Sequence, residues 1–146
     1  MTFLDASAGV KRYLDEIGSD VARSAVDPTY SDLTRVEFPS AIWRKERDGR
    51  LTVDQVGDVL DSFLADWMGT PSTDPTVATV ALDGAVLTRA AHLTGRHGLR
   101  AGDAVQLACA LSARQVDPTI SEFVCFDLRL RDAAAREGFR LVPAAL

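Results

Sequence analysis

The stretch Thr2-Phe3-Leu4-Asp5-Ala6-Ser7 decides the fold, because its short apolar run ends abruptly in a carboxylate and a hydroxyl. If Phe3 and Leu4 form a buried parallel strand, Asp5 stands where that strand leaves the sheet. Open α/β folds place their ligands at this edge. Apolar residues at helical spacing follow, with Gly18 where a helix C-cap is expected. The chain therefore opens as strand, acid and helix.

Strand and helix patterns alternate along the rest of the chain. Further strands are predicted at residues 29–31, 77–82, 123–126 and 139–142. Helices are predicted at residues 10–17, 34–47, 52–67, 84–97, 103–111 and 128–137. Capping-box spacing at Thr34 and Glu37, and again at Thr52 and Gln55, supports two of the helix starts. This alternation predicts the α/β class, with a mainly parallel sheet covered by helices on both faces.

Length and composition limit the number of domains and the class of protein. A chain of 146 residues with 47% hydrophobic content fits a single domain over residues 1–146. No apolar run reaches the roughly 20 residues that span a bilayer, and no signal peptide is visible, so we expect a cytoplasmic protein without a membrane partner. Cys109 and Cys125 fall in helix and strand patterns, which favours reduced core thiols.

Three later carboxylates, Glu37, Asp103 and Asp127, each open a helix or close a strand. All three can therefore meet Asp5 at one edge of a parallel sheet. Carboxylates packed together repel one another unless a cation lies among them, and oxygen ligands alone suit Mg²⁺ or Mn²⁺. Such ions promote phosphodiester hydrolysis. The net charge of −5 does not exclude a nucleic-acid substrate, because four of the negative charges would belong to this site.

Each of these residues also has a structural explanation. Asp5, Ser7 or Asp127 can be a helix N-cap, Glu37 the third position of a capping box, and Asp103 a first-turn acid. Basic residues near Asp5 and Glu37 in sequence can hold phosphates or form a solvated helix face; they are Lys11, Arg12, Arg44, Lys45 and Arg47. Spacing alone leaves these alternatives open.

Four segments in this order resemble the PIN domain, specifically the VapC toxin family of bacterial toxin–antitoxin systems. They are Phe3-Leu4-Asp5-Ala6-Ser7, residues 33–37 (LTRVE), residues 97–108 (HGLRAGDAVQLA) and residues 123–127 (FVCFD). The resemblance covers nearly the whole chain. Each segment alone is a weak signal, but the four together are fairly specific.

The resemblance implies a three-layer α/β/α fold and an endoribonuclease that depends on Mg²⁺ or Mn²⁺. It maps the family's acidic set onto Asp5, Glu37, Asp103 and Asp127, with Ser7 supporting the first acid. It also implies an RNA substrate, a cognate VapB-like antitoxin and a homodimer. Three departures stand out: Cys125 replaces a usual Thr or Ser, Gly102 replaces a larger apolar residue, and Pro39 interrupts the helix that carries Glu37.

Our prediction is a metal-dependent endoribonuclease toxin, and the alternative is a catalytically silent PIN-like binding module. A nucleotide-binding protein of another class lacks support, because no G-x-G-x-x-G or Walker loop follows a strand. Two finer expectations follow. The amphipathic helix ending in Phe63, Leu64 and Trp67 is expected to show aromatic surface to a partner chain. Asp127, rather than Asp132 five residues later, is expected to be the fourth acid.

Overall fold

A computed structural model describes residues 1–146, in which five short strands alternate with seven helices. The strands are β1 (Thr2–Leu4), β2 (Pro28–Ser31), β3 (Ala78–Val80), β4 (Glu122–Val124) and β5 (Arg140–Val142). The helices are α1 (Ala6–Tyr13), α2 (Ser19–Arg23), α3 (Thr34–Arg47), α4 (Val53–Met68), α5 (Gly84–His97), α6 (Ala101–Val116) and α7 (Leu128–Arg136). The predicted alternation of strands and helices is confirmed.

The five strands form one parallel sheet in the order β3-β2-β1-β4-β5. β1 therefore lies in the middle, with β2 on one side and β4 on the other. Leu4 is the register partner of Val124, so β1 and β4 end at the same level. Any side chain that directly follows either strand emerges at one common edge of the sheet.

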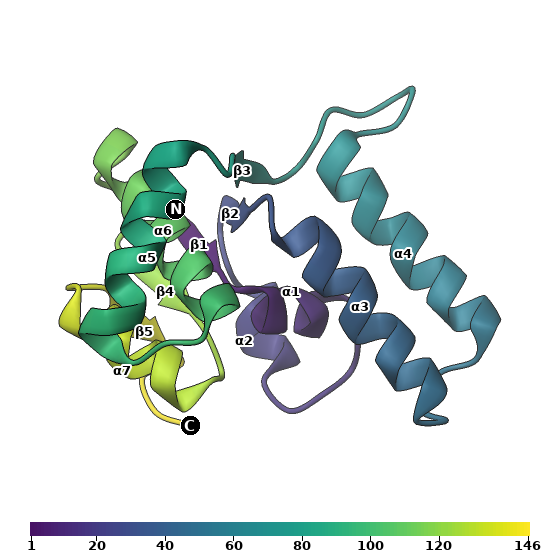
Figure 1. The fold of residues 1–146 in the computed structure, drawn as a ribbon. Helices are drawn as coiled ribbons and strands as arrows, with labels where there is room; N and C mark the ends of the chain where they lie inside the picture. Colours follow the sequence, from purple (N-terminus) through teal and green to yellow (C-terminus); the bar gives the residue numbers. More distant parts are fainter.

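Alternating side chains send the two faces of the sheet into two separate cores. Phe3 and Phe123 stack with ring centroids 5.4 Å apart in the core that α5, α6 and α7 cover. Leu4 and Val124 point the other way, into the core built with α1, α3 and α4. Figure 1 shows the sheet between these two groups of helices. The fold is the three-layer α/β/α arrangement that the sequence predicts.

Side-chain caps start the helices at several predicted places. The Thr52 hydroxyl accepts the Gln55 backbone N–H and the Gln55 side chain accepts the Thr52 N–H, which completes the predicted capping box. Asp83 accepts the Val86 N–H at 2.8 Å and opens α5. Gly98 ends that helix with a φ of +64°, a conformation that glycine adopts without strain. None of the helices is long and apolar enough to cross a membrane.

The prediction for residues 10–29 is wrong in two respects. α1 ends at Tyr13 rather than near Ile17, which is 96% exposed, and a short unpredicted helix, α2, follows. Gly18 precedes α2 instead of ending α1. Its φ is +88°, and a Cβ there would lie 2.4 Å from the Phe126 ring, so only glycine fits.

The predicted capping box at the start of α3 is also wrong. Leu33 occupies the N-cap without a side-chain hydrogen bond, and Thr34 is a fully buried residue of the helix itself. Pro39 lies inside α3 and does not interrupt it, because the helix runs from Thr34 to Arg47. Proline lacks an N–H, so the carbonyl one turn earlier loses its helical partner. That carbonyl belongs to Arg35, an exposed residue that water can reach.

The predicted aromatic surface on α4 is absent. Phe63 is 3% exposed and Trp67 is 7% exposed, because they pack on residues from other elements. The rings of Phe38 and Phe63 stack with centroids 4.0 Å apart, and Trp67 lies against Tyr30. The apolar side chains that α4 does expose are Val53, Leu64 and Met68.

Candidate active site

The four predicted acids line a single cleft of about 400 Å³ at the carboxyl edge of the sheet. Asp5 directly follows β1, and Asp127 lies just beyond the neighbouring strand β4. Glu37 is in the first turn of α3 and Asp103 in the first turn of α6. The remaining lining residues are Ala6, Ser7, Ser40, Ala41, Arg44 and Gln106. Residues from four distant segments are thus brought together.

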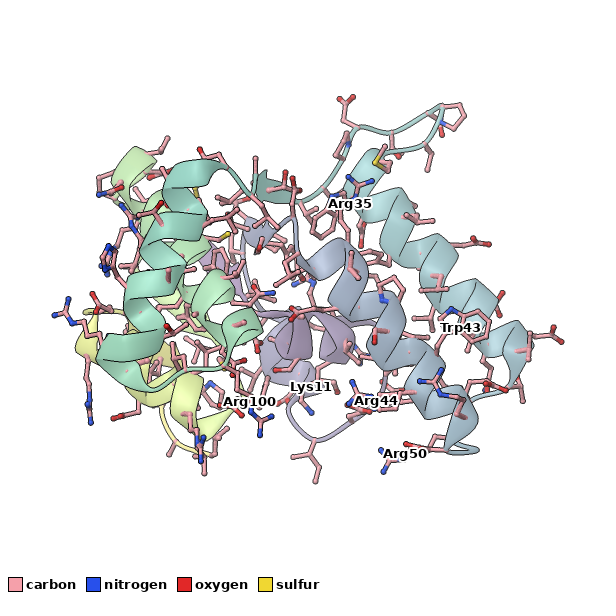
Figure 2. All side chains as sticks on the ribbon, in the orientation of Figure 1. Lys11, Arg35, Trp43, Arg44, Arg50 and Arg100 are labelled. Atoms are coloured by element: carbon pink, nitrogen blue, oxygen red, sulfur yellow. The ribbon has the colours of Figure 1, made fainter.

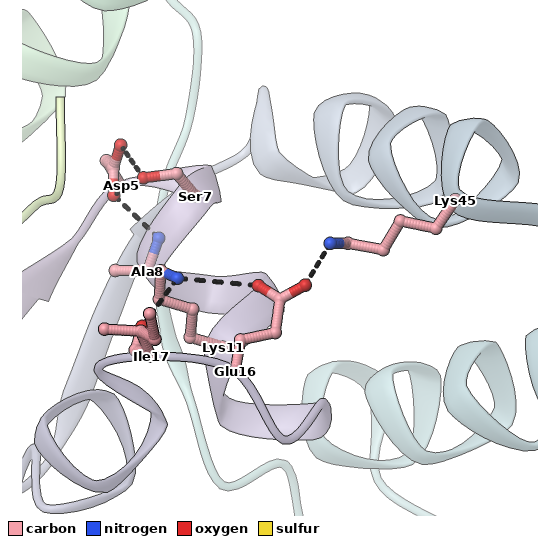
Figure 3. A network of polar contacts seen from close by, with 7 residues as sticks. All are labelled: Asp5, Ser7, Ala8, Lys11, Glu16, Ile17 and Lys45. Atoms are coloured by element: carbon pink, nitrogen blue, oxygen red, sulfur yellow. Dashed lines mark hydrogen bonds and ion pairs between the residues drawn. The ribbon is translucent and has the colours of Figure 1, made fainter. Parts of the chain in front are cut away.

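Asp5 is the most deeply buried of the four acids, at 5% exposure. Its Oδ1 accepts the Ala8 N–H at 2.9 Å, so it does cap α1, and the Ser7 hydroxyl donates to the carboxylate at 2.8 Å. Figure 3 shows these contacts. Burial raises the pKa of Asp5 to about 6, although the hydrogen bonds from Ala8 and Ser7 oppose the rise. Asp5 therefore caps α1 and lines the cleft at the same time.

Asp127 likewise combines a cap with a place in the cleft. Its Oδ1 accepts the N–H groups of Arg129 and Leu130 at 2.9 and 3.0 Å and opens α7. Its Oδ2 accepts no hydrogen bond from the chain. Capping thus occupies one carboxylate oxygen and leaves the other one for a ligand.

Cys125 links Asp5 and Asp127. Its thiol lies 3.6 Å from Asp5 Oδ2 as a weak donor, and its sulfur accepts the Asp127 N–H at 3.3 Å. Burial and then the charge of Asp5 raise the pKa of the thiol, which keeps it protonated. The departure from Thr or Ser therefore retains a contact with Asp5, through a poorer donor than a hydroxyl. Both cysteines are free and buried, as predicted.

Glu37 is held by a residue that sequence reasoning missed. Gln106, which is 2% exposed, donates its Nε2 to Glu37 Oε2 at 2.7 Å and to the Thr34 hydroxyl at 3.2 Å. Burial raises the pKa of Glu37, the Gln106 hydrogen bond lowers it, and the charge of Asp103 raises it further. A Cβ on Gly102 would lie 2.8 Å from Glu37 Oε1. The small residue at 102 thus gives the Glu37 carboxylate its room.

Asp103 accepts no hydrogen bond from the chain. Its pKa is raised by burial and then by the charge of Asp127, while Arg100 lowers it. The pKa values of Asp5, Glu37 and Asp103 are therefore raised chiefly by burial, and neighbouring carboxylate charges add to the rise at Glu37 and Asp103.

The donor set suits a hard divalent ion, because it consists of carboxylate oxygens: Asp5 is buried, Glu37 and Asp103 are half-buried, and Asp127 is exposed. Asp127 Oδ2 and Glu37 Oε1 accept no hydrogen bond, which leaves donor atoms for a ligand. Nevertheless, no group of three or more Asp, Glu, His or Cys side chains is placed to hold a metal ion as it stands. The cleft has the right chemistry but not a preassembled cage, so carboxylates that are less firmly held than Asp5, such as Asp103, would have to turn toward it to share an ion.

Asp132 lies outside the cleft. Its Oδ2 pairs with Arg136 Nη2 at 2.9 Å along α7, and both side chains are about two-thirds exposed. The position of Asp132 on the helix allows Arg129, Arg136 or solvent as its partner, and the structure shows Arg136. Of the two acids in the closing strand-helix unit, only Asp127 lines the cleft.

Two solved structures share the fold. The crystal structure of FitAcB from Neisseria gonorrhoeae matches with a TM-score of 0.58 and 16% identity, covering 92% of this chain and 94% of that one. A toxin–antitoxin complex from Klebsiella pneumoniae matches with a TM-score of 0.55 and 12% identity, covering 87% of each chain.

Two proteins are similar to the chain in sequence as well. The ribonucleases VapC45 and VapC49, from two strains of Mycobacterium tuberculosis, are each 33% identical to the chain over 150 aligned residues. The match covers 100% of this chain and 97% of each relative. A search for matching family models found none. Because the identity extends over the full length, the chain belongs to the VapC family of PIN-domain ribonucleases.

Proposed function

We propose that the chain is the ribonuclease toxin of a toxin–antitoxin pair, an endonuclease that hydrolyses phosphodiester bonds in cellular RNA with Mg²⁺ or Mn²⁺. The observation that carries this proposal is the single cleft lined by Asp5, Glu37, Asp103 and Asp127 in a chain of this family. Asp5, Asp103 and Asp127 would hold the principal ion. When bound, such an ion neutralises charge on the phosphate and makes water a better nucleophile.

The chain's own groups have separable tasks in this proposal. Ser7 and the Ala8 N–H fix the orientation of Asp5, so this buried carboxylate cannot turn away from the cleft. Gln106 holds Glu37 through Oε2, while Oε1 stays without a hydrogen bond. Because burial raises the pKa of Glu37 above that of a free carboxyl, Oε1 is a stronger proton acceptor than an ordinary carboxylate and would help to position or activate the attacking water.

The proposal includes an antitoxin partner. One of the two solved structures with this fold is a toxin–antitoxin complex, and we propose that this chain also binds a VapB-like antitoxin that blocks the cleft. A homodimer is part of the same proposal. Exposed apolar side chains on α3 and α4 support a partner-facing surface; they are Val36, Leu64 and Met68.

One observation favours the second candidate, a catalytically silent binding module. No three acids are placed to hold an ion as they stand. The two candidates differ in a simple assay. Total cellular RNA incubated with the purified chain and Mg²⁺ or Mn²⁺ is expected to give discrete fragments, and the cognate antitoxin is expected to stop their formation. RNA left intact across both metals would favour the silent module.

A further inference from the structure

A second depression of about 330 Å³ adjoins the acidic cleft. Its lining residues are Ser7, Val10, Lys11, Glu16, Ala41, Arg44, Lys45, Asp48 and Arg50. Ser7, Ala41 and Arg44 line both hollows, which therefore form one continuous surface. Arg44, in the last turns of α3, stands at the junction.

The two lysines of this depression are already committed to other groups. Lys11 Nζ pairs with Glu16 Oε2 at 3.5 Å and donates to the Ile17 carbonyl at 2.8 Å, and Lys45 pairs with Glu16 Oε1 (Figure 3). Burial alone would raise the pKa of Glu16, but the hydrogen bond and charge of Lys45 outweigh it and leave the pKa low. Glu16 thus stays ionised and offsets part of the charge of both lysines.

The two arginines are free by contrast. Neither Arg44 nor Arg50 makes a hydrogen bond or an ion pair within the chain, and both are exposed. Figure 2 shows them with Lys11 and Arg100 along the same side of the molecule. Arg100 lies near Asp103, since its charge lowers the pKa of that acid. Uncommitted cations therefore stand on both sides of the cleft.

A simpler explanation covers only part of this arrangement. Arg44 lies in the last turn of α3, where a cation complements the negative end of the helix. Arg50 lies beyond the helix end, and the dipole does not explain why it lines the same hollow. The depression holds four basic and two acidic side chains beside a cleft with four carboxylates. Its surplus positive charge suits an anion that extends out of the cleft.

We propose that Arg44 and Arg50 bind an RNA backbone phosphate beside the scissile one, so that the strand leaves the cleft past the last turn of α3. This inference rests on the proposed ribonuclease function. A guanidinium binds a phosphate through two parallel hydrogen bonds, and both arginines have all their donors free. They are positioning residues, because they hold the substrate without touching the reacting atoms.

The test measures RNA binding in an Asp5→Asn background, so that no RNA is cut. A fluorescent single-stranded RNA of mixed sequence is titrated by anisotropy with NaCl between about 50 and 300 mM. Arg44→Ala is expected to weaken binding about fivefold to tenfold at the lowest salt and to reduce the slope of log Kd against log salt by about 0.7. The double variant with Arg50→Ala should lose about twice that slope. Arg44→Lys should keep most of the slope, since a lysine retains the charge.

Arg35→Ala is the matched control. Arg35 is also exposed and unpaired, and Figure 2 shows it at the other end of α3. We expect its binding constant and its salt slope to match those of the parent. An unchanged slope for Arg44→Ala, or an equal loss for Arg35→Ala, would overturn the proposal. Arg44→Ala that weakens inhibition by the antitoxin and leaves RNA binding intact would overturn it too, because the depression would then serve a protein partner.

The binding assay separates this inference from the proposed function. If the Asp5→Asn protein binds RNA through Arg44 while the wild type cuts none, the ribonuclease proposal fails, and Arg44 and Arg50 are left as a phosphate-binding site without an adjacent scissile phosphate. If the wild type cuts RNA and Arg44→Ala changes neither the salt slope nor KM, the phosphate site fails alone.

Discussion

Replacing Asp5 by Asn is expected to abolish RNA cleavage and, at the same time, to stabilise the metal-free protein above neutral pH. Asn retains an oxygen that can accept the Ala8 N–H, so the cap on α1 survives. It lacks the negative charge that a divalent ion needs, and we expect cleavage to fall by about 10³-fold or more.

The stability effect has a defined sign. Burial raises the folded-state pKa of Asp5 from 3.8 to about 6, so the folded chain binds the proton more tightly than the unfolded chain does. This contribution to stability is complete below pH 3.8 and is lost as the pH rises through 6. The loss amounts to roughly 3 kcal/mol at pH 8, which Asn avoids, and corresponds to a gain of several degrees in Tm.

Thermal unfolding in EDTA at several pH values measures this effect. The Tm advantage of Asp5→Asn should be largest at pH 8 and should shrink steadily towards pH 4. A variant that cleaves RNA at the wild-type rate and shows the same Tm difference at every pH would reduce Asp5 to a helix cap.

The second large effect is a contrast between two acids in the same unit. Asp127→Asn is expected to reduce metal-dependent cleavage by about 100-fold or more, because the carboxylate that lines the cleft loses its charge. Its cap on α7 should persist, since Asn also accepts backbone N–H groups. Asp132→Asn should leave cleavage within about twofold, because it breaks only an exposed pair with Arg136.

Initial rates on one RNA substrate at saturating Mn²⁺ measure the contrast. Equal losses in both variants would mean that Asp132 also serves the site. A larger loss for Asp132→Asn would mean that Asp132, and not Asp127, is the fourth acid of the site.

The sequence alone was sufficient to predict the strand-end acids. Asp5 closes an apolar run too short for a helix, and the acid at 127 follows another such run, so parallel strands bring the two to one edge. Local spacing fails where a partner is distant. Gln106 lies 69 residues from Glu37 in the chain, and no periodicity reports that contact. The only sign of Gln106 in the sequence is that a polar side chain follows Asp103 by about one helical turn.

Two other errors share a physical origin. Thr34 and Glu37 have capping-box spacing, yet tertiary packing buries Thr34 and pairs it with Gln106. Phe63 and Trp67 were expected on the surface because amphipathicity shows that a helix has an apolar face but not what covers it. Here α1, α3 and the sheet cover that face.

The helix α2 was not predicted for a different reason, because five residues are too few to show a helical period.

The central claim is that the acidic cleft cuts RNA only with a divalent ion. Cleavage of one RNA substrate, followed first in excess EDTA and then after Mg²⁺ or Mn²⁺ is added beyond the chelator, tests it most directly. We predict that cleavage stops in EDTA and returns with either ion, because four carboxylates alone offer no charge neutralisation to a phosphate. Undiminished cleavage in excess EDTA would contradict the account.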